Sequence, residues 1–125
     1  MATIMIVDDD KHLQKGLAMV LSIGGHTIVG QAYNGAEAVE MFSRMNPKPD
    51  IILMDYRMPI MNGASATEKI ITAHPNSRIL FISADSTLAS EVLQLGALEF
   101  LTKPLRSKDL FIAIERSLSI QHSKH

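Results

Sequence analysis

The sequence contains no cysteine, no excess of charge and no long apolar run, and each absence excludes a class of protein. Without cysteine the chain forms neither disulfides nor thiolate metal sites, which fits a reducing cytoplasm. Twelve Lys and Arg residues oppose thirteen Asp and Glu residues, so the net charge of −1 gives no case for binding nucleic acid or an anionic membrane. No apolar run approaches the roughly 20 residues of a membrane span. The opening stretch, MATIMIVDDD, lacks the basic segment of a signal peptide.

Internal repeats, low-complexity segments and a linker are also missing. With 125 residues, of which 46% are hydrophobic, the chain has the size and composition of one globular domain. We therefore expect a single domain over residues 1–125, with its core at about 3–119 and a short polar tail at 120–125.

What the sequence does contain is a regular alternation of two patterns. Five short runs rich in Ile and Val show no polar/apolar alternation, which predicts parallel strands buried on both faces. These runs are 3–7, 26–32, 51–54, 78–82 and 99–102. Between and after them the apolar residues recur at helical spacing, least clearly in 64–74. Five strands alternating with five helices predict right-handed crossovers and a doubly wound α/β fold, a three-layer sandwich.

Residue types at the predicted helix ends support the helices. Asn34 and Glu37 form a variant of the capping box, Ser86 and Ser107 are expected N-caps, and Gly24 and Gly96 are expected C-terminal stops. The five histidines, at positions 12, 26, 74, 122 and 125, are scattered, so we expect them at the surface, with His74 ending a helix.

Polar residues follow four of the five predicted strands. The first strand leads into Asp8, Asp9 and Asp10, the third into Asp55, the fourth into Ser83 and the fifth into Lys103. Open α/β sheets carry their sites outside the carboxyl ends of the strands, so these side chains should converge on one edge. Each has an ordinary explanation alone, as a helix cap, a loop hydroxyl or a solvated charge. Their joint placement predicts a site.

The residue types of this set indicate phosphoryl chemistry. Clustered carboxylates repel one another and need a cation, and a set of oxygen ligands without His or Cys favours Mg²⁺, Mn²⁺ or Ca²⁺. A carboxylate can itself be the nucleophile and form an aspartyl phosphate. The hydroxyl and the ammonium would then hold the phosphoryl oxygens. Asp55 would sit at the end of a buried strand because it must be held rigidly and yet be reachable.

Four motifs resemble the receiver domain of two-component response regulators. They are V-D-D-D, L-M-D-Y-R-M-P-x-M-N-G, F-I-S-A and G-A-x-x-F-L-T-K-P, and they occur in the family's order over residues 3 to about 119. The resemblance implies a flavodoxin-like five-stranded sheet of order 2-1-3-4-5. It makes Asp55 the phosphoacceptor, Ser83 the switch hydroxyl, Phe100 the switch aromatic and Lys103 the phosphate-binding lysine. It implies Mg²⁺, with Mn²⁺ as a substitute, held by Asp8, Asp9, Asp55 and the backbone carbonyl of Arg57.

The resemblance also implies partners and a mode of signalling. The phosphoryl group would come from a sensor histidine kinase or a phosphotransfer protein in the cytoplasm. The face built by helix 4, strand 5 and helix 5 would then change and bind a downstream protein or a second copy, with no direct contact to nucleic acid or membrane. Such a chain modifies itself without turning over a substrate, so it is not expected to be an enzyme. The Lys103–Pro104 bond is expected to be cis.

Two positions are less common variants of the family pattern. Ser83 stands where threonine is frequent, and Phe100 stands where tyrosine is frequent. A further pair lies at the expected rim of the site, because Arg57 follows Asp55 by two residues and Asp85 follows Ser83 by two. These opposite charges are either an ion pair across the entrance or two solvated side chains.

Three other functions compete with this interpretation. A phosphohydrolase of the haloacid-dehalogenase type would use a D-x-D-x-[TV] motif; Asp8 and Asp10 match it, but His12 replaces the Thr or Val. A nucleotide binder would need a glycine-rich phosphate loop, and neither G-x-G-x-x-G nor G-K-[ST] occurs. A receiver that only docks, without phosphorylation, is disfavoured because no site residue is missing.

Overall fold

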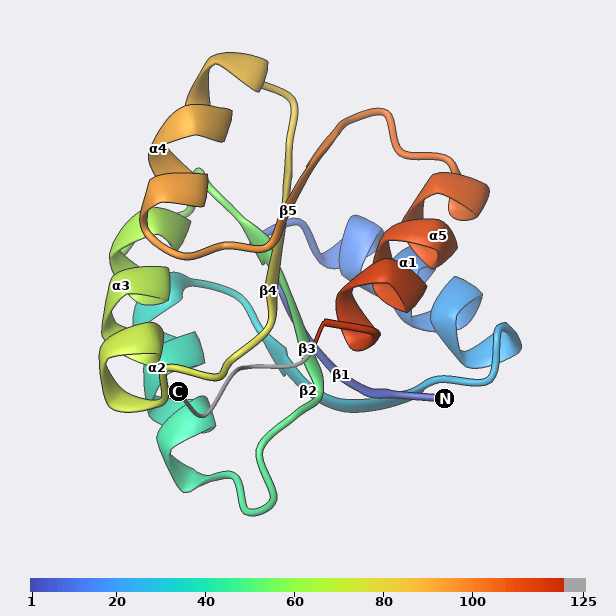
Figure 1. Cartoon of the computed structure of the whole chain (residues 1–125), viewed down its shortest axis with the longest axis horizontal. Coiled ribbons are helices and arrows are strands. Elements are labelled where there is room, and N and C mark those ends of the chain that lie inside the picture. The colour runs from blue at the N-terminus through green and yellow to red at the C-terminus, as the bar shows by residue number, and fades with distance from the viewer. Residues whose placement is uncertain (121–125) are drawn as a thin grey trace.

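Five parallel strands form a sheet through the middle of the computed structural model, which describes residues 1–120 (Figure 1). The strands are β1 (Thr3–Val7), β2 (Thr27–Ala32), β3 (Ile51–Asp55), β4 (Ile79–Ser83) and β5 (Glu99–Thr102). Their order across the sheet is β2-β1-β3-β4-β5, and each neighbouring pair is parallel. The predicted α/β fold and strand order are confirmed.

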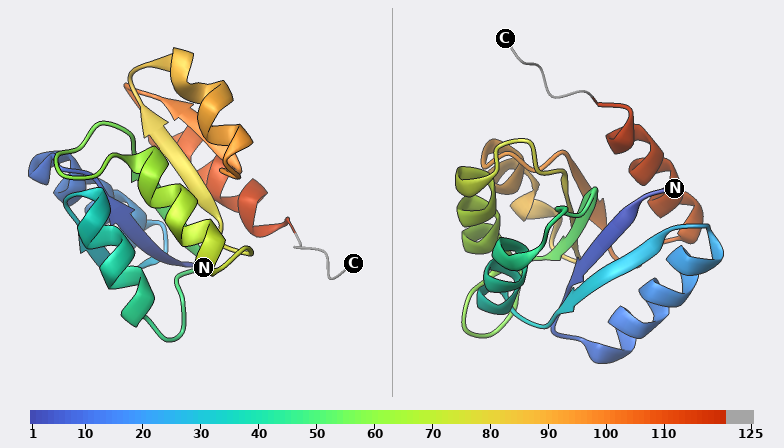
Figure 2. Two further views of the ribbon diagram at one scale, coloured as in Figure 1. Left: turned by 90° about the vertical axis from the view of Figure 1, so that its left-hand side faces the viewer. Right: turned by 90° about the horizontal axis from the view of Figure 1, so that it is seen from below.

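Helices cover both faces of this sheet. They are α1 (Lys11–Ile23), α2 (Gly35–Arg44), α3 (Gly63–Ala73), α4 (Ala89–Gln94) and α5 (Ser107–Leu118), with a 3₁₀ turn, η1 (Ser86–Leu88), before α4. Helices α1 and α5 lie on one face and α2, α3 and α4 on the other, as Figures 1 and 2 show. Among residues 1–120, no helix combines the length and the apolar character needed to cross a membrane.

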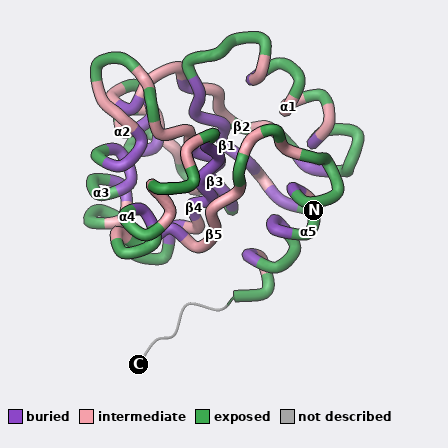
Figure 3. The backbone as a smooth tube through the Cα atoms, turned by 90° about the horizontal axis from the view of Figure 1, so that it is seen from above, coloured by how far each residue is buried: buried purple, intermediate pink, exposed green. Residues whose placement is uncertain are grey.

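The sheet separates two apolar clusters, because successive side chains of a strand point to opposite faces. In β3, Ile52 and Met54 pack toward α2, α3 and α4, whereas Ile51 and Leu53 pack toward α1 and α5. Burying each such side chain stabilises the fold by about 1.5–3 kcal/mol. Figure 3 shows that the buried residues concentrate in the central strands. Strands β1, β3 and β4 therefore match the prediction of strands buried on both faces.

The same prediction is wrong for both edge strands. β5 pairs only with β4; it is half-buried and ends in the exposed Thr102. The prediction also fails for β2. Residues Thr27 and Val29 of this strand are exposed, because β2 is an edge strand and only β1 pairs with it. The strand also starts at Thr27, one residue later than expected.

The histidine prediction needs one correction. His26 is buried in the turn before β2; its Nδ1 accepts a hydrogen bond from the Ala2 N–H at 3.0 Å, and its ring stacks on Phe111. His12 and His74 are exposed as expected, and His74 ends α3. Positions 122 and 125 lie outside the described residues.

Two of the predicted N-caps are wrong. Ser86 and Ser107 are the first residues inside η1 and α5, and the residues before them occupy the cap positions. Asp85 caps η1 by accepting from the Thr87 N–H at 3.0 Å. A carboxylate is a stronger acceptor than a hydroxyl, so Asp85 takes the cap one residue earlier. The predicted helix around residue 88 accordingly begins as a 3₁₀ turn.

The other predicted helix ends are confirmed. The Asn34 side chain caps α2 by accepting from the Glu37 N–H at 2.8 Å, although the Glu37 carboxylate reaches back to the Tyr33 N–H rather than to that of Asn34. Gly24 ends α1, and Gly96, with φ of +116°, follows α4. The Lys103–Pro104 peptide bond is cis, as expected.

Candidate functional site

The predicted site residues meet at the carboxyl edge of the sheet. Asp55 is the last residue of β3, Ser83 is the last of β4, and Lys103 follows β5. All three line an open depression of about 410 Å³, whose rim carries Arg57 and Asp85. The topology alone produces this convergence, because parallel strands end at the same edge.

Three carboxylates cluster beside the depression. One oxygen from each of Asp8, Asp9 and Asp55 lies within 4.8 Å of the other two. Asp8 is only 3% exposed, Asp9 is exposed, and Asp55 is half-buried, so the cluster is closed on the protein side and open to solvent on the other. This arrangement could admit a small cation with part of its water shell.

Lys103 partly neutralises the cluster. Its Nζ lies 3.4 Å from Asp8 Oδ2 and 3.5 Å from Asp55 Oδ1. Burial nevertheless raises the pKa of Asp55 to about 6, and the neighbouring Asp8 carboxylate adds to this rise. Burial also raises the pKa of Asp8, against the opposing effects of the Asp10 N–H and Lys103. The two acids are therefore held at a cost that a bound cation would offset.

Asp10 has a different role from its two neighbours. Its carboxylate is the N-cap of α1 and accepts from the N–H groups of His12 and Leu13, at 3.0 and 3.1 Å. Its own N–H donates to Asp8 Oδ1 at 2.9 Å, which orients the Asp8 carboxylate. Asp10 is therefore a helix cap. Asp8 and Asp9 are the two residues of this run whose carboxylates cluster with that of Asp55.

A buried glutamine that the sequence reasoning missed supports this edge of the sheet. Gln14 is 1% exposed, and its Nε2 lies within 3.2 Å of the backbone carbonyls of Ile6, Asp8 and Ala32. The amide thereby joins α1 to the ends of β1 and β2, including the backbone of Asp8 itself. The available signal was a polar residue that points inward from α1, next to Leu13 and Leu17.

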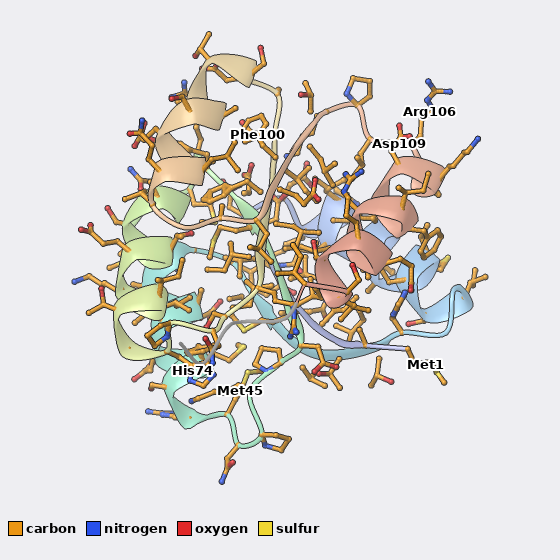
Figure 4. All side chains as sticks on the ribbon, in the orientation of Figure 1. Met1, Met45, His74, Phe100, Arg106 and Asp109 are labelled. Carbon is orange, nitrogen blue, oxygen red and sulfur yellow. The ribbon has the colours of Figure 1, made fainter. Side chains whose placement is uncertain are left out.

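Ser83 and Phe100, the predicted switch residues, lie on neighbouring strands but are not paired with each other. Ser83 is buried, and its Oγ accepts from the Asp85 N–H at 3.2 Å, which leaves the hydroxyl proton free to donate. Phe100 is half-buried, pairs in register with Phe81 of β4, and packs on the cluster beneath α2, α3 and α4. In Figure 4 its ring lies on the α4 side of β5.

Two side chains that follow Asp55 reach across to the segment after β4. Arg57 Nη2 lies 3.1 Å from Asp85 Oδ2, so of the two alternatives for this pair the structure contains the ion pair, although the Arg57 side chain stays largely exposed. The Tyr56 hydroxyl donates to the Glu91 carboxylate of α4 at 3.1 Å, a contact that the sequence reasoning missed. Together they join the start of the β3–α3 loop to the β4–α4 segment.

Known proteins are similar to this chain in both sequence and fold. The family model described as the response regulator receiver domain matches residues 4–115. The chemotaxis protein CheY of Thermotoga maritima is 34% identical over 90% of this chain and 94% of its own length. CheY of Bacillus subtilis is 32% identical over 93% of this chain and 97% of its own length.

Solved structures agree with these relatives. CheY of Borrelia burgdorferi, crystallised as a CheX-CheY-BeF3-Mg²⁺ complex, has a TM-score of 0.90 at 29% identity, over 94% of this chain and 90% of that one. The non-phosphorylated HemR receiver domain of Leptospira biflexa has a TM-score of 0.84 at 28% identity over the full length of both. The chain belongs to the response regulator receiver domain family, whose members act in two-component signalling.

Proposed function

We propose that the chain is a phosphorylated receiver that accepts a phosphoryl group on Asp55 from the phosphohistidine of a sensor kinase or phosphotransfer protein. The observation that carries this proposal is the convergence of three carboxylates with Lys103 and Ser83 at one open edge. A carboxylate oxygen of Asp55 attacks phosphorus and forms an acyl phosphate. The bond from phosphorus to the donor imidazole breaks, and its electron pair leaves with the imidazole.

The donor set of the acidic cluster fits Mg²⁺. Mg²⁺ takes oxygen ligands at about 2.1 Å, and the three carboxylates, each with one oxygen within 4.8 Å of the other two, lie close enough together to share one such ion. Asp8, Asp9, Asp55 and the Arg57 carbonyl would hold Mg²⁺ or Mn²⁺, which would neutralise charge on the phosphoryl oxygens. Lys103 binds another phosphoryl oxygen, and the Ser83 hydroxyl donates to a third.

The use of Asp10 argues against the phosphohydrolase alternative. That chemistry needs the second acid of the D-x-D pair beside the nucleophile as a proton donor. Here the Asp10 carboxylate is committed to the N–H groups that open α1. Receivers are in general signalling domains rather than enzymes, and we assign this chain no substrate turnover of its own.

A small phosphodonor such as acetyl phosphate, with Mg²⁺, tests the proposal directly. It should add one base-labile phosphoryl group to the wild-type chain and none to Asp55→Asn. A receiver that only docks would take no label in either form. A kinase in the cytoplasm would be the natural donor, and a downstream protein or a second copy would bind the α4-β5-α5 face.

The Arg57–Asp85 ion pair should lengthen the lifetime of the acyl phosphate. It lies across the entrance through which water must approach in line with the bond that breaks. Arg57→Ala and Asp85→Ala should each speed phosphoryl loss by about two- to fivefold, as expected for an exposed pair worth up to about 1 kcal/mol. Decay of the isolated ³²P-labelled protein measures this.

The double variant is the control for a shared gate. If the pair acts as a unit, the double variant should lose phosphate no faster than either single variant. Strictly multiplicative effects, or no effect in either single variant, would mean that the two side chains do not close the entrance together.

Phe100 should move when Asp55 is phosphorylated. Ser83 shifts toward the charged phosphoryl oxygens because a charged acceptor strengthens its hydrogen bond. The space this opens beneath β5 is filled by the Phe100 ring, and burying that ring leaves no hydroxyl without a partner. Beryllofluoride with Mg²⁺ should therefore shift the Phe100 ring resonances, and Ser83→Ala should reduce the shift by more than about half. Ring resonances that are identical in both states would contradict the aromatic switch.

A further inference from the structure

The loop between β3 and α3, residues 56–62, contains a backbone conformation that its sequence does not favour. Ile60 has φ of +70°, alone among the non-glycine residues of 1–120. The Met61 N–H donates to the Pro59 carbonyl at 2.7 Å, so Ile60 is the central residue of a γ-turn with positive φ, a rare and strained turn. A β-branched side chain adds to the strain, because its Cβ crowds the backbone in this region.

Hydrogen bonds near both ends hold the loop in this shape. The Gly35 N–H at the start of α2 donates to the Met61 carbonyl at 2.9 Å, and a Cβ at position 35 would overlap that carbonyl. The Gly63 N–H donates to the Tyr56 carbonyl at 2.7 Å, and a Cβ at position 63 would overlap the Asp55 carbonyl. Strained backbone persists where its surroundings impose it, and such places concentrate at functional sites.

Burial of the Ile60 side chain does not offset this strain. It is 84% exposed, which makes it one of the most exposed large apolar residues of the described chain. Asparagine or glycine would adopt the same backbone at lower cost. Neither the apolar clusters nor the acidic cluster includes Ile60, so packing within the described chain does not account for an isoleucine at this position.

We infer that Ile60 is a docking contact for the protein that donates the phosphoryl group, and that it meets an apolar surface beside the donor's phosphohistidine. The inference rests on the proposed function. The loop leaves β3 directly after Asp55, on the same edge of the sheet, so a protein that brings a phosphohistidine to Asp55 approaches beside this loop. A small phosphodonor enters without touching it. A loop held rigidly in advance also loses little entropy on binding.

The test compares a protein donor with a small donor. The protein donor is chosen from the complete set of histidine kinases and phosphotransfer proteins of the source organism, as the one that labels the wild-type chain fastest. Ile60→Asn should lower kcat/KM for this donor at least about fivefold, as for a central interface residue, while the rate with acetyl phosphate stays within about twofold. Ile60→Gly should lower the protein-donor rate similarly and raise the melting temperature by about 2–4 °C.

Ile23→Asn is the matched control. Ile23 is also β-branched and is 81% exposed, but it ends α1 at the opposite edge of the sheet. This variant should keep wild-type rates with both donors.

The outcomes separate the inference from the function on which it rests. An unchanged protein-donor rate in Ile60→Asn would overturn the docking contact. So would an equal loss with acetyl phosphate, or an effect confined to self-association or to binding of a downstream target. Failure of acetyl phosphate and of every kinase to label the wild-type chain would instead overturn the proposed function.

Discussion

Phosphorylation should fall at least about a hundredfold when Asp55 is replaced by asparagine, because an amide cannot form the acyl phosphate that a carboxylate forms. The substitution keeps the shape of the side chain and its place at the end of β3, so the depression and its other residues stay in position. Intact-protein mass spectrometry after incubation with acetyl phosphate and Mg²⁺ measures the product. Its release under mild base identifies an acyl phosphate.

Two further variants serve as comparisons for Asp55→Asn. Asp10→Asn changes an equally charged neighbour of the cluster but keeps the cap of α1, since asparagine caps as well as aspartate, and it should be labelled normally. Lys103→Ala should still bind metal but transfer about ten- to a hundredfold more slowly, because the phosphoryl group loses its counter-charge. A label that persists in Asp55→Asn, or that maps to a histidine, would refute the assignment.

Without metal, the contribution of Asp55 to the stability of the chain should fall as pH rises from about 4 to about 7. The pKa of Asp55 in the folded protein is raised to about 6, above its unfolded value near 4, so the folded state binds more protons within this window. The contribution of Asp55 to the free energy of unfolding then falls with pH. At pH 7, Asp55→Asn should be more stable than the wild type by about 2–3 kcal/mol, and the difference should shrink toward pH 4. Denaturant titrations in EDTA at several pH values measure it.

Millimolar Mg²⁺ should reverse this effect. A cation among the three carboxylates favours their charged forms, so it should stabilise the wild type at pH 7 more than it stabilises Asp55→Asn or Asp9→Asn. Asp10→Asn serves as the control and should follow the wild type. The wild type and Asp55→Asn would have to differ in their free energy of unfolding by an amount that depends on pH and on Mg²⁺. A difference that stays constant between about pH 4 and 7, or that does not change when Mg²⁺ is added, would argue against a shared acidic site.

Much of the site was predictable because its residues follow strands whose apolar runs are unambiguous. Once β1, β3, β4 and β5 are recognised, the parallel arrangement brings Asp8, Asp55, Ser83 and Lys103 to one edge without further information. The positions of Arg57 and Asp85 beside the site were predictable for the same reason, since each residue lies two positions beyond a strand end, but the ion pair between them was not, because solvated side chains fit the sequence equally well.

The features that sequence reasoning missed depend on contacts between distant segments. Nothing near Tyr56 indicates Glu91, and nothing near His26 indicates that Ala2 and Phe111 enclose it. Local competition explains the wrong caps: Asp85 and Ser86 are both good cap residues, and only the backbone of the turn decides between them. Likewise the γ-turn at Ile60 contradicts the local preference of its residue and is imposed by Gly35 and Gly63.

The division of the interior into two clusters gives the α4-β5-α5 face, the proposed binding surface for a downstream partner, two unequal halves. In β5, Phe100 belongs to the cluster under α4, whereas the next residue, Leu101, belongs to the cluster under α5. If the Phe100 ring moves as we propose, it would repack the α4 half and leave the α5 half as a constant surface. A partner that binds both halves would then recognise the chain in either state through α5, and only its contacts with α4 would shift the equilibrium between the states.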